Sequence, residues 1–299
     1  MERILILAFA GLGVSFGLAP ALWARAGGAA VEIAVLDAHG VRVAEAGGVG
    51  NRPVLLAVER EFQPGDHIVV SGLRRLAVQL DRGMPECELH LAGESFSFAV
   101  PLGRAEPEAG SPYPPNAFGG KSHRIVVREL RANELKQERD VARNACDELG
   151  VDGAPEQVRA LPHASTNSVA RDLPDFRARN AIDGVTENGH HGVWPYQSWG
   201  PERRDDLWWK VELGRKVEVD KVRLMIRADF PHDSYWKSAV VEFSDGSEVP
   251  IKIGPSAGFQ EFRFARRRVT WMRITHLVAA DPAKWCSFIE VEAWGRDAR

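Results

Sequence analysis

The sequence contains little cysteine and no strong excess of charge of one sign. Its 299 residues include three cysteines, Cys87, Cys146 and Cys286. They are too few and too scattered for a disulfide framework or a zinc-binding pattern, so no covalent cross-link is inferred. The formal net charge is -3 at pH 7, and no long block of like charge suggests a nucleic-acid-binding tail. The composition is that of an ordinary soluble globular protein.

The sequence has no apolar run long enough for a comfortable membrane span. The stretch Ile4–Leu18 is short and rich in glycine. With Arg3 before it and Ala24-Arg25-Ala26 after it, residues 1–26 fit a secretory signal peptide. The alternatives are a buried apolar strand or helix, or a start codon placed too far upstream. A signal peptide predicts a secreted or periplasmic protein, and a cytoplasmic location is the alternative.

Spacings that would require an enzyme are also missing. No spacing forces paired carboxylates, or a nucleophile with an oriented base, into one site. Gly254–Gly258 matches G-x-S-x-G, but strands are expected on both sides where a nucleophile elbow needs a helix. We therefore expect no catalytic residues. The alternative is a carbohydrate-active enzyme, a glycoside hydrolase or lyase, with its site at a domain junction near Tyr113 and Phe118.

What the sequence does contain is a succession of short runs rich in Val, Leu and Phe, separated by turn signals about every ten residues. This pattern predicts an all-β protein, and the length of the chain predicts two domains. We expect an N-terminal β-sandwich over residues 27–130 and a second one over residues 156–299. Residues 131–155 form the linker, and we expect a short helix in it because Glu129–Leu149 contains no Pro or Gly.

Eight of the nine tryptophans lie between Trp194 and Trp294. Four of them fall in strand-like patterns and are expected in the core: Trp208, Trp209, Trp271 and Trp294. The other aromatic residues of this region fall in loop-like segments, where a flat ring can support the apolar face of a sugar: Trp194, Tyr196, Trp199, Trp236 and Trp285.

Four motifs of the second half occur in the order found in one protein family. Ala178–Gly184 resembles the signature A-x-x-A-x-D-G, Trp208–Gly214 the strand W-x-x-V-D-L-G, Val217–Asp229 a strand that ends in R-x-D, and Phe288–Gly295 a closing E-I-x-V-x-G. Together they resemble the discoidin, or coagulation factor 5/8 type C, family, whose fold is shared by family 32 carbohydrate-binding modules and other galactose-binding-like domains. The N-terminal half resembles no family that we recognise.

The resemblance implies a jelly-roll sandwich whose loops at one end bind glycans in a lectin-like manner, often with a structural calcium ion. The implied calcium ligands are the carboxylates of Asp183 and Glu290 and backbone carbonyls around Asn180, Thr186 and Asn188. Calcium binds six to eight such hard oxygens. Without a metal, Asp183-Gly184 would be a simple turn and Glu290 a hydrogen-bonding acid.

The resemblance also implies polar sugar contacts from the loops. The implied ligand-binding residues are His191, Trp194, Tyr196, Trp199, Arg227, Asp229, His232, Asp233 and Trp236. Arg227 and Asp229 point to the same side of a strand end, so a supporting salt bridge between them is as plausible as direct contact. His190 and His191 are adjacent, so their side chains are expected to diverge rather than chelate one ion.

These features favour a non-catalytic module that binds a glycan or oligosaccharide through loops at one end of the C-terminal sandwich. A protein-interaction module remains a further alternative.

Overall fold

A computed structural model describes residues 30–49, 52–102, 111–147 and 160–298. The first half contains β1 (Ala30–Leu36), β2 (Arg42–Val49), β3 (Val54–Val58), β4 (His67–Ser71), β5 (Arg75–Gln79), β6 (Cys87–Leu91), β7 (Ser95–Ala99) and β8 (His123–Glu129). The predicted signal peptide, residues 1–26, lies outside the described residues. None of the helices in the described part of the chain has the length and apolar character that a membrane crossing needs.

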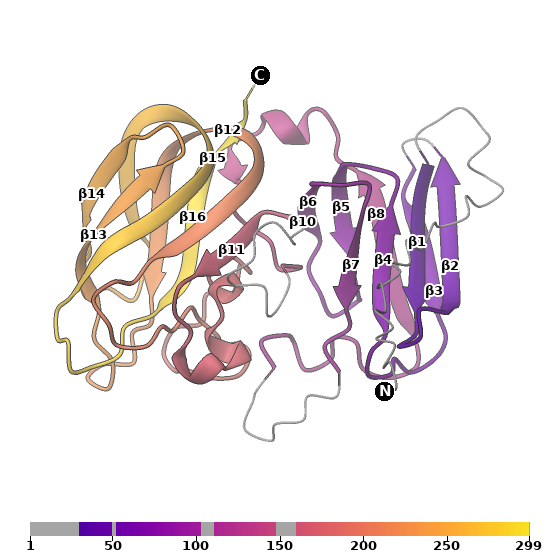
Figure 1. Ribbon diagram of the computed structural model, residues 1–299, viewed down its shortest axis with the longest axis horizontal. Helices are drawn as coiled ribbons and strands as arrows, with labels where there is room; N and C mark the ends of the chain where they lie inside the picture. Colours follow the sequence, from indigo (N-terminus) through magenta and orange to yellow (C-terminus); the bar gives the residue numbers. More distant parts are fainter. Residues whose placement is uncertain (1–29, 50–51, 103–110, 148–159, 299) are drawn as a thin grey trace, which may run out of the picture.

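The N-terminal strands form two antiparallel sheets that face each other (Figure 1). One has the order β2-β1-β4-β7, and the other has the order β10-β6-β5-β8-β3, with β10 being Ala160–Leu161. Alternate residues of each strand point inward, as the burial of Val54, Leu56 and Val58 in β3 illustrates. The N-terminal half is therefore a β-sandwich, as the sequence predicts.

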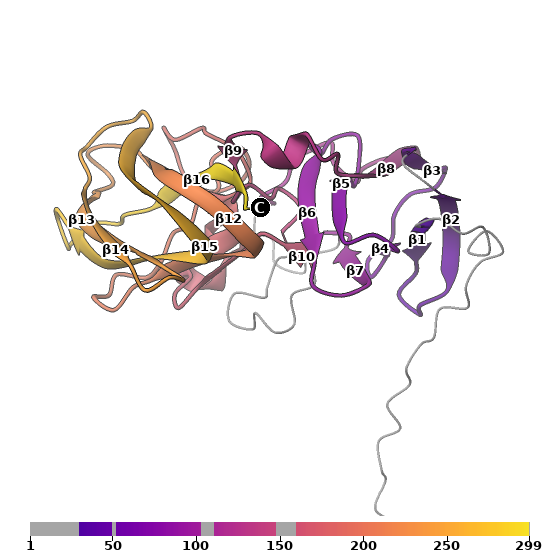
Figure 2. The ribbon, with the colours of Figure 1, turned by 90° about the horizontal axis from the view of Figure 1, so that it is seen from above.

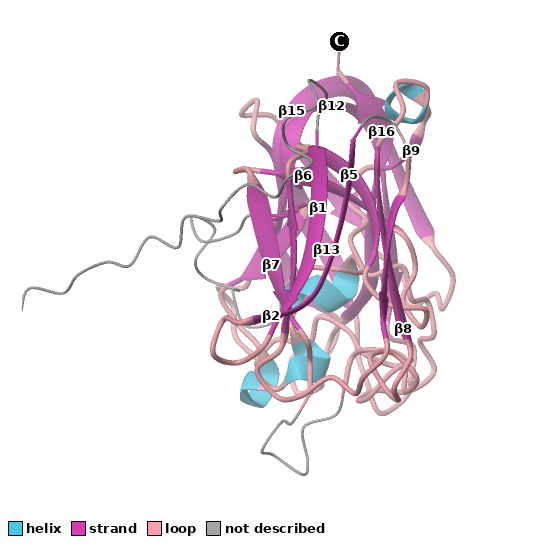
Figure 3. Cartoon of the chain, turned by 90° about the vertical axis from the view of Figure 1, so that its right-hand side faces the viewer, coloured by secondary structure: helices cyan, strands magenta, loops and turns pink. Residues whose placement is uncertain are grey.

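The second half is a separate sandwich whose strands curve around a core rich in aromatic residues (Figure 2). Its elements are β11 (His163–Thr166), three 3-10 helices, η4 (Ala170–Asp172), η5 (Pro174–Phe176) and η6 (Ala178–Ala181), and then β12 (Trp209–Ile226), β13 (Trp236–Phe243), β14 (Glu248–Lys252), β15 (Gln260–Ala279) and β16 (Phe288–Asp297). The sheet order is β14-β13-β15-β12-β16-β9, with β9 being Arg139–Asp140, and β11 pairs with β12. Both halves are all-β, and the few helical turns of the described chain lie outside the sheets (Figure 3).

The prediction of a helical linker is wrong. Among the described linker residues, 131–147, the helical structure is a single 3-10 turn, η2 (Glu134–Lys136), and it is followed by the short strand β9 (Arg139–Asp140), which pairs with β16. The apolar residues of this segment enter different cores, because Val141 packs in the C-terminal core and Cys146 in the N-terminal one. The backbone here bonds to β16 instead of to itself, since Val141 N donates to Ala293 O (2.8 Å), so tertiary packing overrides helical propensity.

Candidate functional site

The candidate site lies at one end of the C-terminal sandwich, where three loops are joined by backbone hydrogen bonds. Ala228 N donates to Asn188 O (2.8 Å), and Arg227 N donates to Ser287 O (3.1 Å). Ser234 N donates to Trp285 O (2.8 Å). Loops that are far apart in the sequence are thus held in register, which gives the side chains above them fixed positions.

Arg227 follows the end of β12 and forms the base of this site. Its Nε and one terminal nitrogen donate to the two carboxylate oxygens of Asp233, at 2.5 and 2.7 Å, and both side chains are buried. Such a forked pair fixes the plane of the guanidinium group. The sequence left open a salt bridge between Arg227 and Asp229, but Arg227 pairs with Asp233 instead.

Two histidines lie beside this pair. The rings of His191 and His232 stack in parallel, with centroids 5.0 Å apart, and His232 Nδ1 lies 3.1 Å from Asp233 Oδ1. Burial, followed by the nearby charge of Arg227, lowers the pKa of His191. The His191 ring is therefore neutral at pH 7 and has one nitrogen that donates and one that accepts.

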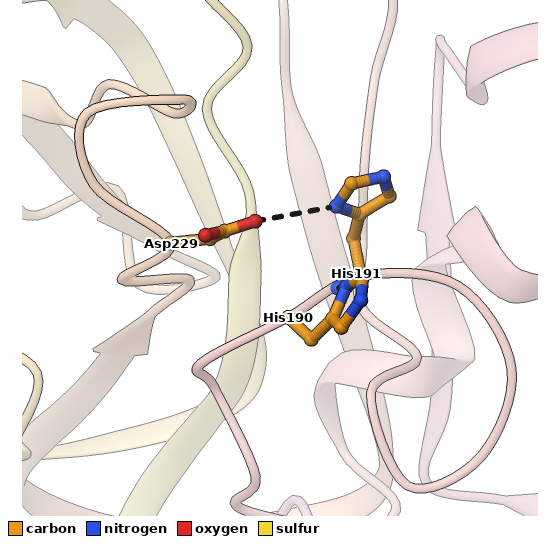
Figure 4. Close-up of side chains that lie close together, drawn as sticks. All are labelled: His190, His191 and Asp229. Carbon is orange, nitrogen blue, oxygen red and sulfur yellow. Dashed lines mark hydrogen bonds and ion pairs between the residues drawn. The ribbon is translucent and has the colours of Figure 1, made fainter.

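The position of His191 Nδ1 is unusual. It is buried and has no hydrogen-bond partner among the described residues. Asp229 Oδ2 lies 3.6 Å away, as the dashed line in Figure 4 shows. That separation is too long for a hydrogen bond, so His191 Nδ1 faces the Asp229 carboxylate without bonding to it.

A pocket of about 130 Å³ opens between these loops. Its walls include three of the residues predicted to bind a ligand, His191, Arg227 and His232. Other lining residues were missed by the sequence analysis: Arg171, Phe176 and Trp285. Trp285 was recognised as a loop aromatic but not placed in the site, because nothing local showed that its loop meets the other two. Its ring is partly buried, and Arg203 lies 5.1 Å from the ring centroid.

Two predicted stacking residues are instead part of the core. Trp199 is completely buried and Trp236 nearly so, and their rings stack on each other with centroids 5.4 Å apart. They present no face to a ligand, so their assignment as surface platforms is wrong. Both residues were expected in loops. In the structure, a β-bridge to Phe288 holds Trp199, and Trp236 is the first residue of β13.

Trp194 and Tyr196 are partly buried but do not line the pocket. Trp194 N donates to Ser111 O of the N-terminal half (3.1 Å), and the ring of Tyr196 lies 5.4 Å from that of His190. The structure therefore separates these two aromatics from the Arg227 pocket.

The same loops bring together groups that could hold a transition metal. Ligand atoms of His190, His191 and Asp229 lie within 4.8 Å of one another, although His190 Nδ1 already accepts from His191 N (2.8 Å). Figure 4 shows His191 and Asp229 facing each other, with the His190 ring close to the His191 backbone. The expectation that the adjacent histidines diverge is therefore wrong. A second group, Asp229, His232 and Asp233, is less suited to a cation because Asp233 already neutralises Arg227.

The residues implied as calcium ligands lie on the side of the sandwich that faces the N-terminal half. Asp183 and Glu290 are both buried. Gly184 N donates to both oxygens of Glu290, at 3.1 and 3.2 Å. Burial raises the pKa of Asp183 to about 6, and burial together with the charge of Asp183 raises the pKa of Glu290. Two buried, mutually repelling carboxylates are a donor set that suits a divalent cation.

The other implied calcium ligands fit less uniformly. Asn188 is occupied, because its carbonyl accepts from Ala228 N and its side chain donates to Ile226 O. The side chain of Asn180 is also used, since its Nδ2 donates to Pro174 O (2.9 Å). Thr186 lines the pocket between the halves together with Glu290. The two carboxylates are thus the part of the implied ligand set that best suits a cation, although both oxygens of Asp183 also accept hydrogen bonds, from Val185 N (2.9 Å) and Gln197 Nε2 (2.8 Å).

That junction pocket has a volume of about 420 Å³. Its charged lining residues include Asp140, whose pKa burial raises to about 7, although its Oδ1 accepts from the backbone of Ala142 and Ala293. Tyr113 and Phe118, where a junction site was expected, are buried in the N-terminal core. Arg179 lies 4.9 Å from the Tyr113 ring, so the two halves do meet there, but in a closed contact.

Comparison with known proteins gives matches among solved structures alone. No family model matches the chain, and neither does any curated protein. Chitosan-binding module 1 of a chitosanase/glucanase from Paenibacillus sp. IK-5 is 21% identical, over 52% of this chain and 99% of that one, with a TM-score of 0.37. The lectin domain of lectinolysin complexed with Lewis B antigen is 22% identical, over 54% and 98%, with a TM-score of 0.38.

A third similar structure is the family 32 module of C. perfringens NanJ in complex with galactose. It is 16% identical, over 44% of this chain and 91% of that one, with a TM-score of 0.34. All three structures are carbohydrate-binding modules or lectin domains.

Proposed function

We propose that the C-terminal sandwich binds a glycan, without cleaving it, in the pocket formed by His191, Arg227, His232 and Trp285. The observation that carries this proposal is the buried His191 Nδ1, which has no hydrogen-bond partner among the described residues and lies 3.6 Å from Asp229 Oδ2. A sugar hydroxyl both donates and accepts, so one hydroxyl could satisfy both groups.

Two other residues of the pocket, Arg227 and Trp285, add a fixed polar group and an aromatic surface for a sugar. Arg227 is fixed by Asp233, so its position does not have to be ordered when the ligand binds. Trp285 adds an aromatic surface for the apolar side of a pyranose ring. Fixed polar groups beside a flat ring are the combination that favours a hydroxylated ligand over an apolar one.

A glycan array tests this proposal. We expect the wild-type protein to bind a defined set of glycans and His191→Ala to lose that binding, with no reducing sugar released on long incubation. Binding that survives His191→Ala and excess free sugar would instead favour a protein-interaction module. Thr270→Ala, on β15 and outside the pocket, serves as the control.

A second candidate is an enzyme at the junction pocket, because Asp140 there has the raised pKa of a general acid. Sugar release that Asp140→Asn abolishes would support this candidate. The two backbone hydrogen bonds to Asp140 favour a structural role, so we place binding first.

We also propose that calcium binds at Asp183 and Glu290, with Thr186 and the Asn180 carbonyl, and acts as a structural ion behind the loop end. The repulsion between the two buried carboxylates supports this. A rise in melting temperature on adding calcium to chelator-treated protein, absent in Glu290→Gln, is the expected result. A secreted or periplasmic location, which glycan binding would suit, is proposed on the N-terminal sequence alone.

A further inference from the structure

Two of the three cysteines lie together at the junction of the two halves. The Sγ atoms of Cys87 and Cys146 are 2.6 Å apart, although 59 positions separate them in the sequence. Both side chains are buried. This separation is well inside the contact distance of two sulfur atoms that are not bonded to each other, and it approaches the length of a disulfide bond.

Both cysteines are held by ordered backbone. Cys87 begins β6 and pairs with Val78 of β5. Cys146 N donates to Asn144 Oδ1 (2.9 Å), and Asn144 Nδ2 donates to Pro162 O (2.7 Å). The approach of the two sulfur atoms is thus set by the fold on each side, rather than by a mobile loop.

We infer that Cys87 and Cys146 form a disulfide bond in the mature protein. The oxidant is a protein or small-molecule disulfide. One cysteine thiolate attacks it to form a mixed disulfide and releases one oxidant thiol. The second thiolate then forms the Cys87–Cys146 bond and releases the other. Two electrons pass to the oxidant, and the two protons lost by the cysteines balance its two new thiols.

The bond would tie the segment that connects the two sandwiches to the N-terminal one, because Cys146 packs with Cys87 in the N-terminal core. Cys87 lies in the N-terminal sheet, whereas Cys146 follows β9, which pairs with β16 of the C-terminal sandwich. Arg139 of β9 already connects the two, because it contacts Glu88 (2.8 Å) and Asp297 (3.0 Å). A disulfide one residue from Glu88 would make this ionic junction covalent.

Burial also affects when the bond can form. It raises the pKa of the Cys146 thiol, so the folded protein holds little of the thiolate that exchange requires. The cross-link would therefore form while the chain is folding and would resist reductants afterwards. Cys286 is buried as well, but in the C-terminal core away from this pair, so it provides an internal control.

Counting free thiols tests the inference. Full-length protein is refolded in a buffer of oxidised and reduced glutathione, denatured, and alkylated with and without prior reduction, and its intact mass is measured. Wild type is expected to take up one alkyl group without reduction and three after it. Cys286→Ala should take up no alkyl group without reduction and two after it. Cys87→Ser should take up two under both conditions, once glutathione adducts have been excluded from the measured mass. Three groups on unreduced wild type would overturn the inference, and denaturation exposes every thiol to the reagent, so burial does not affect the counts.

Discussion

Removing the indole of Trp285 should weaken glycan binding without unfolding the protein. Trp285→Ala deletes the aromatic wall of the pocket and leaves in place its backbone carbonyl, which accepts from Ser234 N. A tryptophan buries 150–250 Å² in total, so one face covered by a sugar corresponds to roughly 100 Å². At about 25 cal/mol per Å² this is ~2.5 kcal/mol, which corresponds to a loss of affinity of about 10- to 100-fold.

Isothermal titration with the strongest ligand found on a glycan array measures this loss. Trp271→Ala is a matched control, because Trp271 is also partly buried and has a cation, Lys210, 4.8 Å from its ring centroid, but it does not line the pocket. We expect the control to bind like wild type. An equal loss in both variants, or unchanged affinity in Trp285→Ala, would refute the assignment of the pocket.

Three further predictions concern stability. Asp183 has a pKa of about 6 in the folded protein, above its ordinary value of 3.8, so its contribution to stability is present below pH 4 and is lost as the pH rises through 6. Asp183→Asn should remove this part of the pH dependence of the free energy of unfolding in urea. A pH profile equal to that of wild type would contradict the prediction. Asp233→Asn leaves Arg227 buried without its partner and should lower the free energy of unfolding by ~3–5 kcal/mol, whereas a loss below ~1 kcal/mol would show that the pair is dispensable. Cys146→Ser should have a free energy of unfolding about 4 kcal/mol lower than that of oxidised wild type, because the unfolded chain without the cross-link gains loop entropy. Equal midpoints of chemical denaturation would argue against a cross-link.

The strands could be predicted from the sequence where inward and outward residues alternate. β3 (Val54–Val58) is an example, because its apolar residues Val54, Leu56 and Val58 are buried and the residues between them are exposed. β2 was missed because Ala46-Gly47-Gly48 offers no apolar face of its own, and it forms by pairing with β1. The motif strands Trp208–Gly214 and Val217–Asp229 are joined in the structure as one strand, β12. Bulges between Glu212 and Val217 and between Val219 and Lys221 let it continue past these polar positions while it pairs with the similarly long β15.

The candidate site was only partly predictable. His191, Arg227 and His232 were placed together through a family resemblance, and the structure brings them to one pocket. Trp236 was predicted to stack on the ligand but is in the core, whereas Trp285, predicted to be a loop aromatic but not assigned to the site, lines the pocket. Burial depends on which strand or loop packs above a ring and not on its neighbours in the sequence. The Cys87–Cys146 contact was missed for the same reason, since it forms only when the linker packs against β6.

The measurement that tests glycan binding most directly is a crystal structure of the protein soaked with a mixture of galactose, fucose and N-acetylgalactosamine. The account predicts a sugar between Trp285 and Arg227, with one hydroxyl within hydrogen-bond distance of both His191 Nδ1 and Asp229 Oδ2. A sugar in the junction pocket beside Asp140, with the Arg227 pocket empty, would contradict it.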